Sequence, residues 1–70
     1  MPKTFKELIL LVEEDGWKQV SQRGSHRKFK HPTKPGIIII APHRLSDIVA
    51  PGTEKSILRQ AGLLYEEDLS

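Results

Sequence analysis

The sequence predicts a small α+β domain with the element order helix, strand, strand, strand, helix. Two segments, one near each end, carry apolar residues at the spacing of an amphipathic helix. The segment between them is rich in glycine, proline and β-branched residues, which favour turns and strands. A three-stranded antiparallel sheet with both helices on one face would bury two such helices. The 70 residues make a single domain, residues 1–70, with an expected ordered core of about residues 4–64.

The first helix is expected over residues 4–15. Its apolar face consists of Phe5, Leu8, Ile9 and Val12. Thr4 and Glu7 have the spacing of a capping box, in which each side chain accepts a hydrogen bond from the other residue's backbone. Gly16 should end the helix, because glycine adopts a positive φ at little cost.

Three strands are expected in the middle of the chain. Residues 17–23 and 25–31 form the first two, joined by a tight hairpin at Gly24. Residues 32–36 contain two prolines and a glycine and predict a turn. The four isoleucines at residues 37–40 then predict a third strand, because β-branched side chains favour extended backbone.

The second helix is expected from about residue 54 to 61, with Gly52 or Thr53 as its N-cap and Gly62 as its stop. Its buried stripe should consist of Ile57, Leu58 and Ala61, extended by Leu64. The acidic tail over residues 66–70 is expected to be loose.

Positive charge is concentrated in the middle of the chain. No Asp or Glu occurs between Gly16 and Ser46, yet this stretch holds seven Lys and Arg residues and all three histidines. The whole protein has a formal net charge of only +2. A polyanion would therefore be attracted to the middle and repelled by the ends, and nucleic acid is the first candidate.

Several function classes are excluded by composition. The chain has no cysteine, so it forms no disulfide and has no thiolate for zinc binding or nucleophilic attack. Its longest apolar runs, Leu8 to Val12 among them, are five residues long, well short of the ~20 residues of a membrane span. The N-terminus lacks the pattern of a signal peptide. We therefore expect a cytoplasmic protein with no membrane association.

Alternation along the second strand separates its side chains into two faces. Phe29 is the large apolar residue of this strand, so its face should lie against the helices. That face also carries Ser25, Arg27 and His31. The opposite, open face carries His26, Lys28 and Lys30. Two ammonium groups beside an imidazole suit a phosphate backbone and a general base, although such a face can also be merely solvated.

Other candidate residues lie outside this strand. His43, in the loop after the third strand, could serve as a second site residue, whereas His31 fits a structural role before a proline. Gly52 and Thr53 present free backbone N–H groups that could bind a phosphate or form an ordinary helix start. The three histidines lack metal-ligand spacing and lie among cations, so no metal or cofactor is expected.

A set of short motifs occurs along almost the whole chain. They are Gly16-Trp17, Gln22-Arg23-Gly24-Ser25-His26-Arg27-Lys28-Phe29, Pro42-His43, Pro51-Gly52-Thr53 and Ile57-Leu58-Arg59-Gln60-Ala61-Gly62. Together they closely resemble the HicA toxins, in that family's order. The resemblance implies a fold like that of double-stranded-RNA-binding domains. It also implies a ribosome-independent mRNA interferase, the toxin of a bacterial toxin–antitoxin pair, silenced by a HicB-type antitoxin; with no metal expected, this cleavage would be metal-independent.

The resemblance singles out His26 as the catalytic residue, because the family's catalytic histidine is the one in the Gly-Ser-His motif. The residues then expected to bind RNA are Lys28, Lys30, Arg23, Gly52 and Thr53. The secondary candidates are His43 and Ser25.

The isoleucine run predicts a partner surface. Neighbouring strand residues point to opposite faces, so one alternate pair within residues 37–40 must face away from the core. An exposed pair beside the open face would suit an antitoxin contact. Alternatively, Trp17 or the loop at residues 43–51 folds over it.

Two other functions fit the same charge pattern. A non-catalytic double-stranded-RNA-binding module would use the open face without needing His26. A small domain that binds only another protein would need neither the open face nor His26. Both RNA functions predict an affinity that falls steeply with salt, and RNA degradation in the presence of EDTA separates the enzyme from the binding module.

Overall fold

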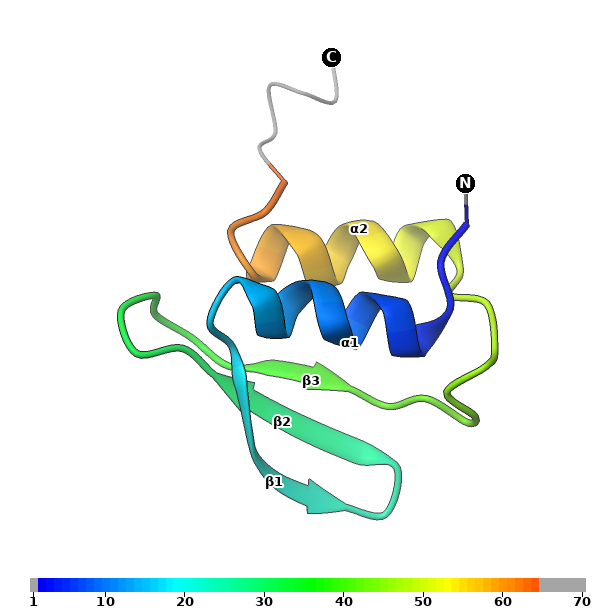
Figure 1. The fold of residues 1–70 in the computed structure, drawn as a ribbon, viewed down its shortest axis with the longest axis horizontal. Helices are drawn as coiled ribbons and strands as arrows, with labels where there is room; N and C mark the ends of the chain where they lie inside the picture. Colours follow the sequence, from blue (N-terminus) through cyan, green and yellow to red (C-terminus); the bar gives the residue numbers. More distant parts are fainter. Residues whose placement is uncertain (1, 65–70) are drawn as a thin grey trace.

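The fold has the predicted element order and a sheet of three antiparallel strands in the order β1-β2-β3. A computed structural model describes residues 2–64 of the chain, so the tail expected to be loose lies outside the described residues. The elements are α1 (Phe5–Glu14), β1 (Lys18–Arg23), β2 (His26–Lys30), β3 (Ile38–Ile40) and α2 (Pro51–Gln60). In Figure 1 the β1–β2 hairpin extends away from the two helices. The α+β prediction is confirmed.

Helix α1 begins with the predicted capping box. The Glu7 backbone N–H donates to the Thr4 hydroxyl at 3.2 Å, and the Thr4 backbone N–H donates to the Glu7 carboxylate at 2.9 Å. The hydrogen bonds from the Thr4 backbone and hydroxyl hold the pKa of Glu7 below its usual value near 4.5. After the C-cap Asp15, Gly16 has a φ of 112° and turns the chain toward the sheet.

The sheet has one buried face and one open face. Residues that lie opposite one another on paired strands belong to the same face. Phe29 lies opposite Ile38, and Arg27 lies opposite Ile40. Phe29 and both of these isoleucines are buried in the core. Lys28 lies opposite Ile39 on the other face. The open face predicted from alternation is therefore confirmed.

The isoleucine run is divided between the two faces. Ile38 and Ile40 are buried, whereas Ile37 is 45% exposed and Ile39 is 52% exposed. Neither Trp17 nor the loop after β3 covers the exposed pair. Trp17 itself is 1% exposed and belongs to the core.

Strand β1 is exposed along its whole length, and it begins at Lys18 rather than at Trp17 as expected. Its pairing with β2 shifts by one residue between Gln19 and Ser21, which makes a β-bulge at Val20.

The predicted N-cap of α2 is wrong. Ala50 is the N-cap, with extended backbone and no side-chain cap hydrogen bond, and Pro51 occupies the first helical position. The ring of proline fixes a helical φ and needs no N–H partner there, so Gly52 and Thr53 fall inside the first turn. Gly62, with a φ of 73°, follows the helix as predicted.

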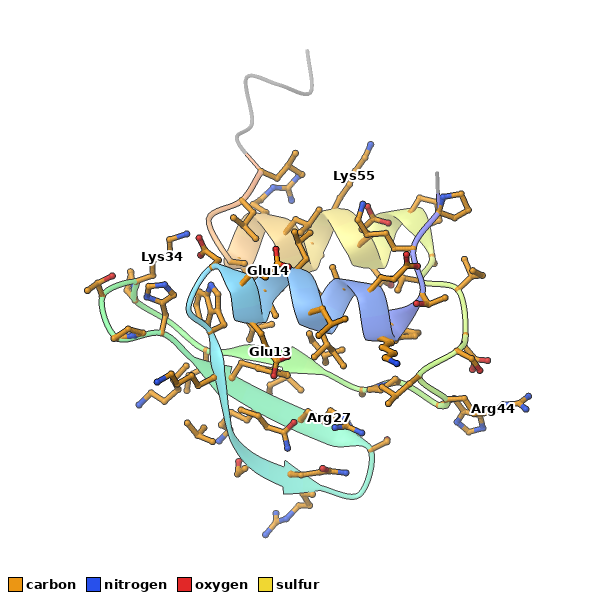
Figure 2. All side chains as sticks on the ribbon, viewed as in Figure 1. Glu13, Glu14, Arg27, Lys34, Arg44 and Lys55 are labelled. Atoms are coloured by element: carbon orange, nitrogen blue, oxygen red, sulfur yellow. The ribbon has the colours of Figure 1, made fainter. Side chains whose placement is uncertain are left out.

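Trp17 joins three elements where α1 ends. Its indole Nε1–H donates to the Ala61 carbonyl at 3.3 Å, and its ring meets His31 edge-on with centroids 5.3 Å apart. His31 Nε2 lies 2.7 Å from the Asp15 carbonyl. The Lys34 ammonium contacts the Asp15 carboxylate and the Ala61 carbonyl. Figure 2 shows Lys34 at this end of the molecule.

We predict that Gly16→Ala lowers the free energy of unfolding by about 2–4 kcal/mol. A Cβ at this position would lie 2.7 Å from Nε2 of His31, whose ring is held by hydrogen bonds. In addition, the φ of 112° at Gly16 is strained for any residue with an L side chain. Gly24→Ala is the matched control: φ is 60° but no atom lies within 4 Å, so its cost should be about 1 kcal/mol. Equal losses in urea unfolding would contradict the predicted contact.

We also predict an acid-sensitive contribution from Asp15. The hydrogen bond from Lys34 holds the pKa of the Asp15 carboxyl below its usual value near 3.8. The ionised carboxylate therefore stabilises the fold at a pH above the unfolded-state pKa of this group. The contribution is lost as the pH falls through the lower pKa of the folded state.

Urea unfolding at pH 7 and about pH 2.5 tests this linkage. The wild type should lose more stability on acidification than Asp15→Asn or Lys34→Met, which lack this pair and keep other acid-sensitive contributions such as that of Glu7. Parallel losses in all three proteins would show that the Asp15–Lys34 pair does not contribute.

Candidate functional site

A shallow depression of about 520 Å³ lies on the open face of the sheet, at the hairpin end. Its lining residues are Ser21, Gln22, Arg23, His26, Lys28 and Ile39. His26 is exposed to solvent at the start of β2. The predicted catalytic histidine therefore lies in a hollow that a ligand can enter.

The strand register determines which groups surround His26. Arg23 lies opposite His26, and Ser21 lies opposite Lys28. Ile39 lies opposite Lys28 on the other side, in β3. A guanidinium and an ammonium group thus flank one imidazole, with an apolar side chain at the edge.

The bulge at Val20 adds a cation to this face. Lys18 and Arg23 are five positions apart, so strict alternation would place them on opposite faces. With the bulge, Lys18 lies opposite Lys30 and Arg23 lies opposite His26, both on the open face. Like charges placed directly opposite one another destabilise a sheet, so the Lys18–Lys30 pair favours the binding of an anion there.

The other predicted residues are placed differently. Lys30 shares the open face but lies beyond the depression. Ser25 is exposed in the hairpin turn, and His43 is exposed in the loop after β3; neither lines the depression. Figure 2 shows Arg44, the neighbour of His43, at the opposite end of the molecule from Lys34.

Gly52 and Thr53 line a second hollow of about 500 Å³, between β3 and α2. Its remaining lining residues are Phe5, Ile39, Ala41, Ser56, Ile57 and Gln60. Ile39 lines both hollows, so the two adjoin at this residue. Phosphate binding by Gly52 and Thr53 stays a prediction.

His31 is structural. Its Nδ1 accepts hydrogen bonds from the backbone N–H groups of Thr33 and Lys34, each at 3.0 Å. Nδ1 therefore carries no proton, and the neutral ring donates through Nε2 to the Asp15 carbonyl. With both nitrogens occupied by the backbone, this ring is not available for proton transfer to a substrate.

Two negative findings apply to residues 2–64. No group of three or more His, Asp or Glu side chains in this part of the chain is arranged to hold a metal ion. Neither helix there has the length and apolar character needed to cross a membrane.

Sequence reasoning missed Lys18 and Ser21 on the open face and Gln22 in the lining of the depression, and it left Ile39 in one of two alternate pairs. The strand register decides between the two pairs, because Phe29 lies opposite the buried Ile38, which leaves Ile39 on the open face. Lys18 shares a face with Ser21 only because of the bulge, and no glycine or proline in β1 marks it.

The comparison with protein families identifies the chain. Over residues 5–63, it matches the sequence profile of a family described as "HicA toxin of bacterial toxin-antitoxin". This protein belongs to the HicA toxin family. The resemblance noted in the short motifs is thereby confirmed, and the observed fold is consistent with the double-stranded-RNA-binding-domain-like fold that it implied. No match was found among curated individual proteins.

Membership gives this HicA protein its general role. It is the toxin component of a toxin–antitoxin system, and an antitoxin is therefore implied as its partner.

We predict that His26 and His31 differ in their effect on stability. His31→Ala removes three backbone contacts and the packing on Trp17, and should lower the free energy of unfolding by about 2–3 kcal/mol. His26→Ala removes an exposed side chain and should stay within about 0.5 kcal/mol of the wild type. Thermal and urea unfolding of both variants test this difference; a large loss for His26→Ala would give that residue a structural role.

Proposed function

We propose that this HicA toxin is an endoribonuclease that cleaves mRNA without a metal ion, with His26 as its catalytic residue. The observation that carries the proposal is the position of His26 in a solvent-accessible hollow between Arg23 and Lys28. The three strands contain no acidic residue that would repel a phosphate. The family match supports the same function.

The mechanism begins with the ribose 2′-hydroxyl. His26 accepts its proton, and the 2′-oxygen attacks the adjacent phosphorus. Arg23 and Lys28 stabilise the negative charge that builds up on the phosphate oxygens. The bond from phosphorus to the 5′-oxygen then breaks, leaving a 2′,3′-cyclic phosphate and a 5′-hydroxyl. Arg23 keeps its proton at any ordinary pH, so Lys28 is our candidate donor of the proton that the leaving oxygen needs.

The remaining cations of the open face form the proposed path of the RNA backbone. Lys18 and Lys30 lie opposite each other beyond the hollow, and would contact a phosphate distant from the cleaved one. Such contacts add affinity without selecting a sequence.

The partner proposed for this toxin is a HicB-type antitoxin. Ile37 and Ile39 form an exposed apolar pair at the border of the open face, and we assign them to the antitoxin contact. An antitoxin bound to Ile39 would cover the edge of the hollow that holds His26. Because mRNA is the proposed substrate, the proposed site of action is the cytoplasm.

We predict that the purified toxin, freed of antitoxin, cleaves single-stranded RNA in the presence of EDTA. His26→Ala should reduce the rate by at least about 100-fold, the usual contribution of a general acid or base. Lys28→Ala should slow cleavage and weaken RNA binding, with a smaller dependence of affinity on salt.

Two controls separate this function from its alternatives. An RNA with a 2′-deoxy sugar at the cut site should resist cleavage, because its nucleophile is missing. His26→Gln, which keeps a polar side chain, should still bind RNA. If RNA binds but is not cut by the wild type, the protein is a binding module; if His26→Ala cuts as fast as the wild type, His26 is not the catalytic residue.

A further inference from the structure

The hollow between β3 and α2 shares one lining residue with the hollow that holds His26. Ile39 lines both hollows, and this residue is 52% exposed. An RNA strand with a phosphate beside His26 would therefore bring a neighbouring nucleotide over Ile39 and into the second hollow.

The two hollows differ in chemistry. Arg23 and Lys28 make the first one cationic. Among the described residues that line the second, none is charged. Its walls combine apolar side chains such as Phe5 and Ile57 with polar ones that carry hydroxyl or amide groups. A phosphate suits the first hollow, whereas a neutral nucleobase with a flat face and a polar edge suits the second.

The polar side chains of the second hollow come from one side of α2. Ser56 and Gln60 are four positions apart, which places them on the same helix face. The Gln60 amide donates a hydrogen bond to the Ser56 hydroxyl at 3.1 Å. This bond uses one of the two amide hydrogens and orients the group, so the amide oxygen and the second hydrogen can pair with a base edge.

We infer that the second hollow holds the base of a nucleotide adjacent to the cleaved phosphate, and that Gln60, oriented by Ser56, determines which base is accepted. Ile39 packs against the face of that base. The base must leave its neighbours' stack to enter, so the RNA is unpaired at this nucleotide. The inference rests on the proposed endoribonuclease function, because it supplies the sequence preference of that activity.

A protein segment is the competing occupant of the hollow. A nucleotide is favoured for two reasons: the hollow adjoins the cationic site, and its polar groups lie beside an apolar wall, as base recognition requires. An antitoxin segment that competes for Ile39 would then exclude the RNA base.

Sequencing the ends produced from a randomised RNA pool tests this inference. The wild-type toxin should prefer one base at a fixed position next to the cut. Gln60→Ala should reduce that preference by about tenfold, and Ser56→Ala should reduce it less. The matched control is Gln19→Ala, an exposed glutamine on β1 that lines neither hollow, and it should cut like the wild type.

The outcomes separate this inference from the proposed function. The inference is overturned if the wild type cuts RNA without a base preference, or if Gln60→Ala has the same base preference as the wild type. In both cases the proposed endoribonuclease function is unaffected. Gln60→Glu serves as a second variant should Gln60→Ala fail to fold, because it keeps the shape and loses the donor; an unchanged profile would count equally against us.

Direct binding gives a readout that does not depend on cleavage. Fluorescence anisotropy with RNA oligonucleotides that differ at one base should show a wild-type preference that Gln60→Ala lacks. If each of the two proteins binds all of these oligonucleotides with the same affinity, the inference is overturned, even if no RNA is cut. If Gln60→Ala weakens only the antitoxin complex, the hollow belongs to the protein partner and the inference is wrong.

Discussion

The packing of Trp17 holds this small fold together, because it is the contact at which α1, β2 and α2 meet. The indole donates to the carbonyl of Ala61 just after α2, and its ring packs against His31 just after β2. His31 in turn bonds the carbonyl of Asp15 just after α1. Three chain reversals are thus tied to one another within a few side chains. This junction lies where the chain passes from α1 into the β1–β2 hairpin and from β2 toward β3.

The limited core explains why the candidate site lies where it does. A chain of 70 residues has few apolar side chains to bury, and they cover one face of β2 and β3 while β1 contributes none. The opposite face is free for charged groups at no cost in burial. The strand ladder still holds their backbone in register, and sites built on strands are positioned more precisely than sites on loops. His26 therefore combines exposure with a defined setting.

The two faces of the sheet could be predicted from the sequence, because one large apolar residue, Phe29, decides which alternate side chains of β2 point toward the helices. The capping box at Thr4 and the helix stop at Gly16 could also be predicted from the sequence, because each depends only on residues that are close in the chain. The start of α2 was misjudged although its signal was present: Pro51 favours the first helical position and extended backbone before it. The hollow beside Gln60 could not be predicted, because it depends on how α2 is placed against β3 in three dimensions.

The bulge at Val20 shows that the charge of the open face depends on residue number as well as residue type. It is one extra position in a solvent-exposed strand, and its presence allows Lys18 and Arg23 to point the same way. A deletion of one residue there would turn a cation to the other side of the sheet without altering any charged side chain. Proteins of this fold can therefore change what their surface attracts through a change in strand length, while composition and net charge stay constant.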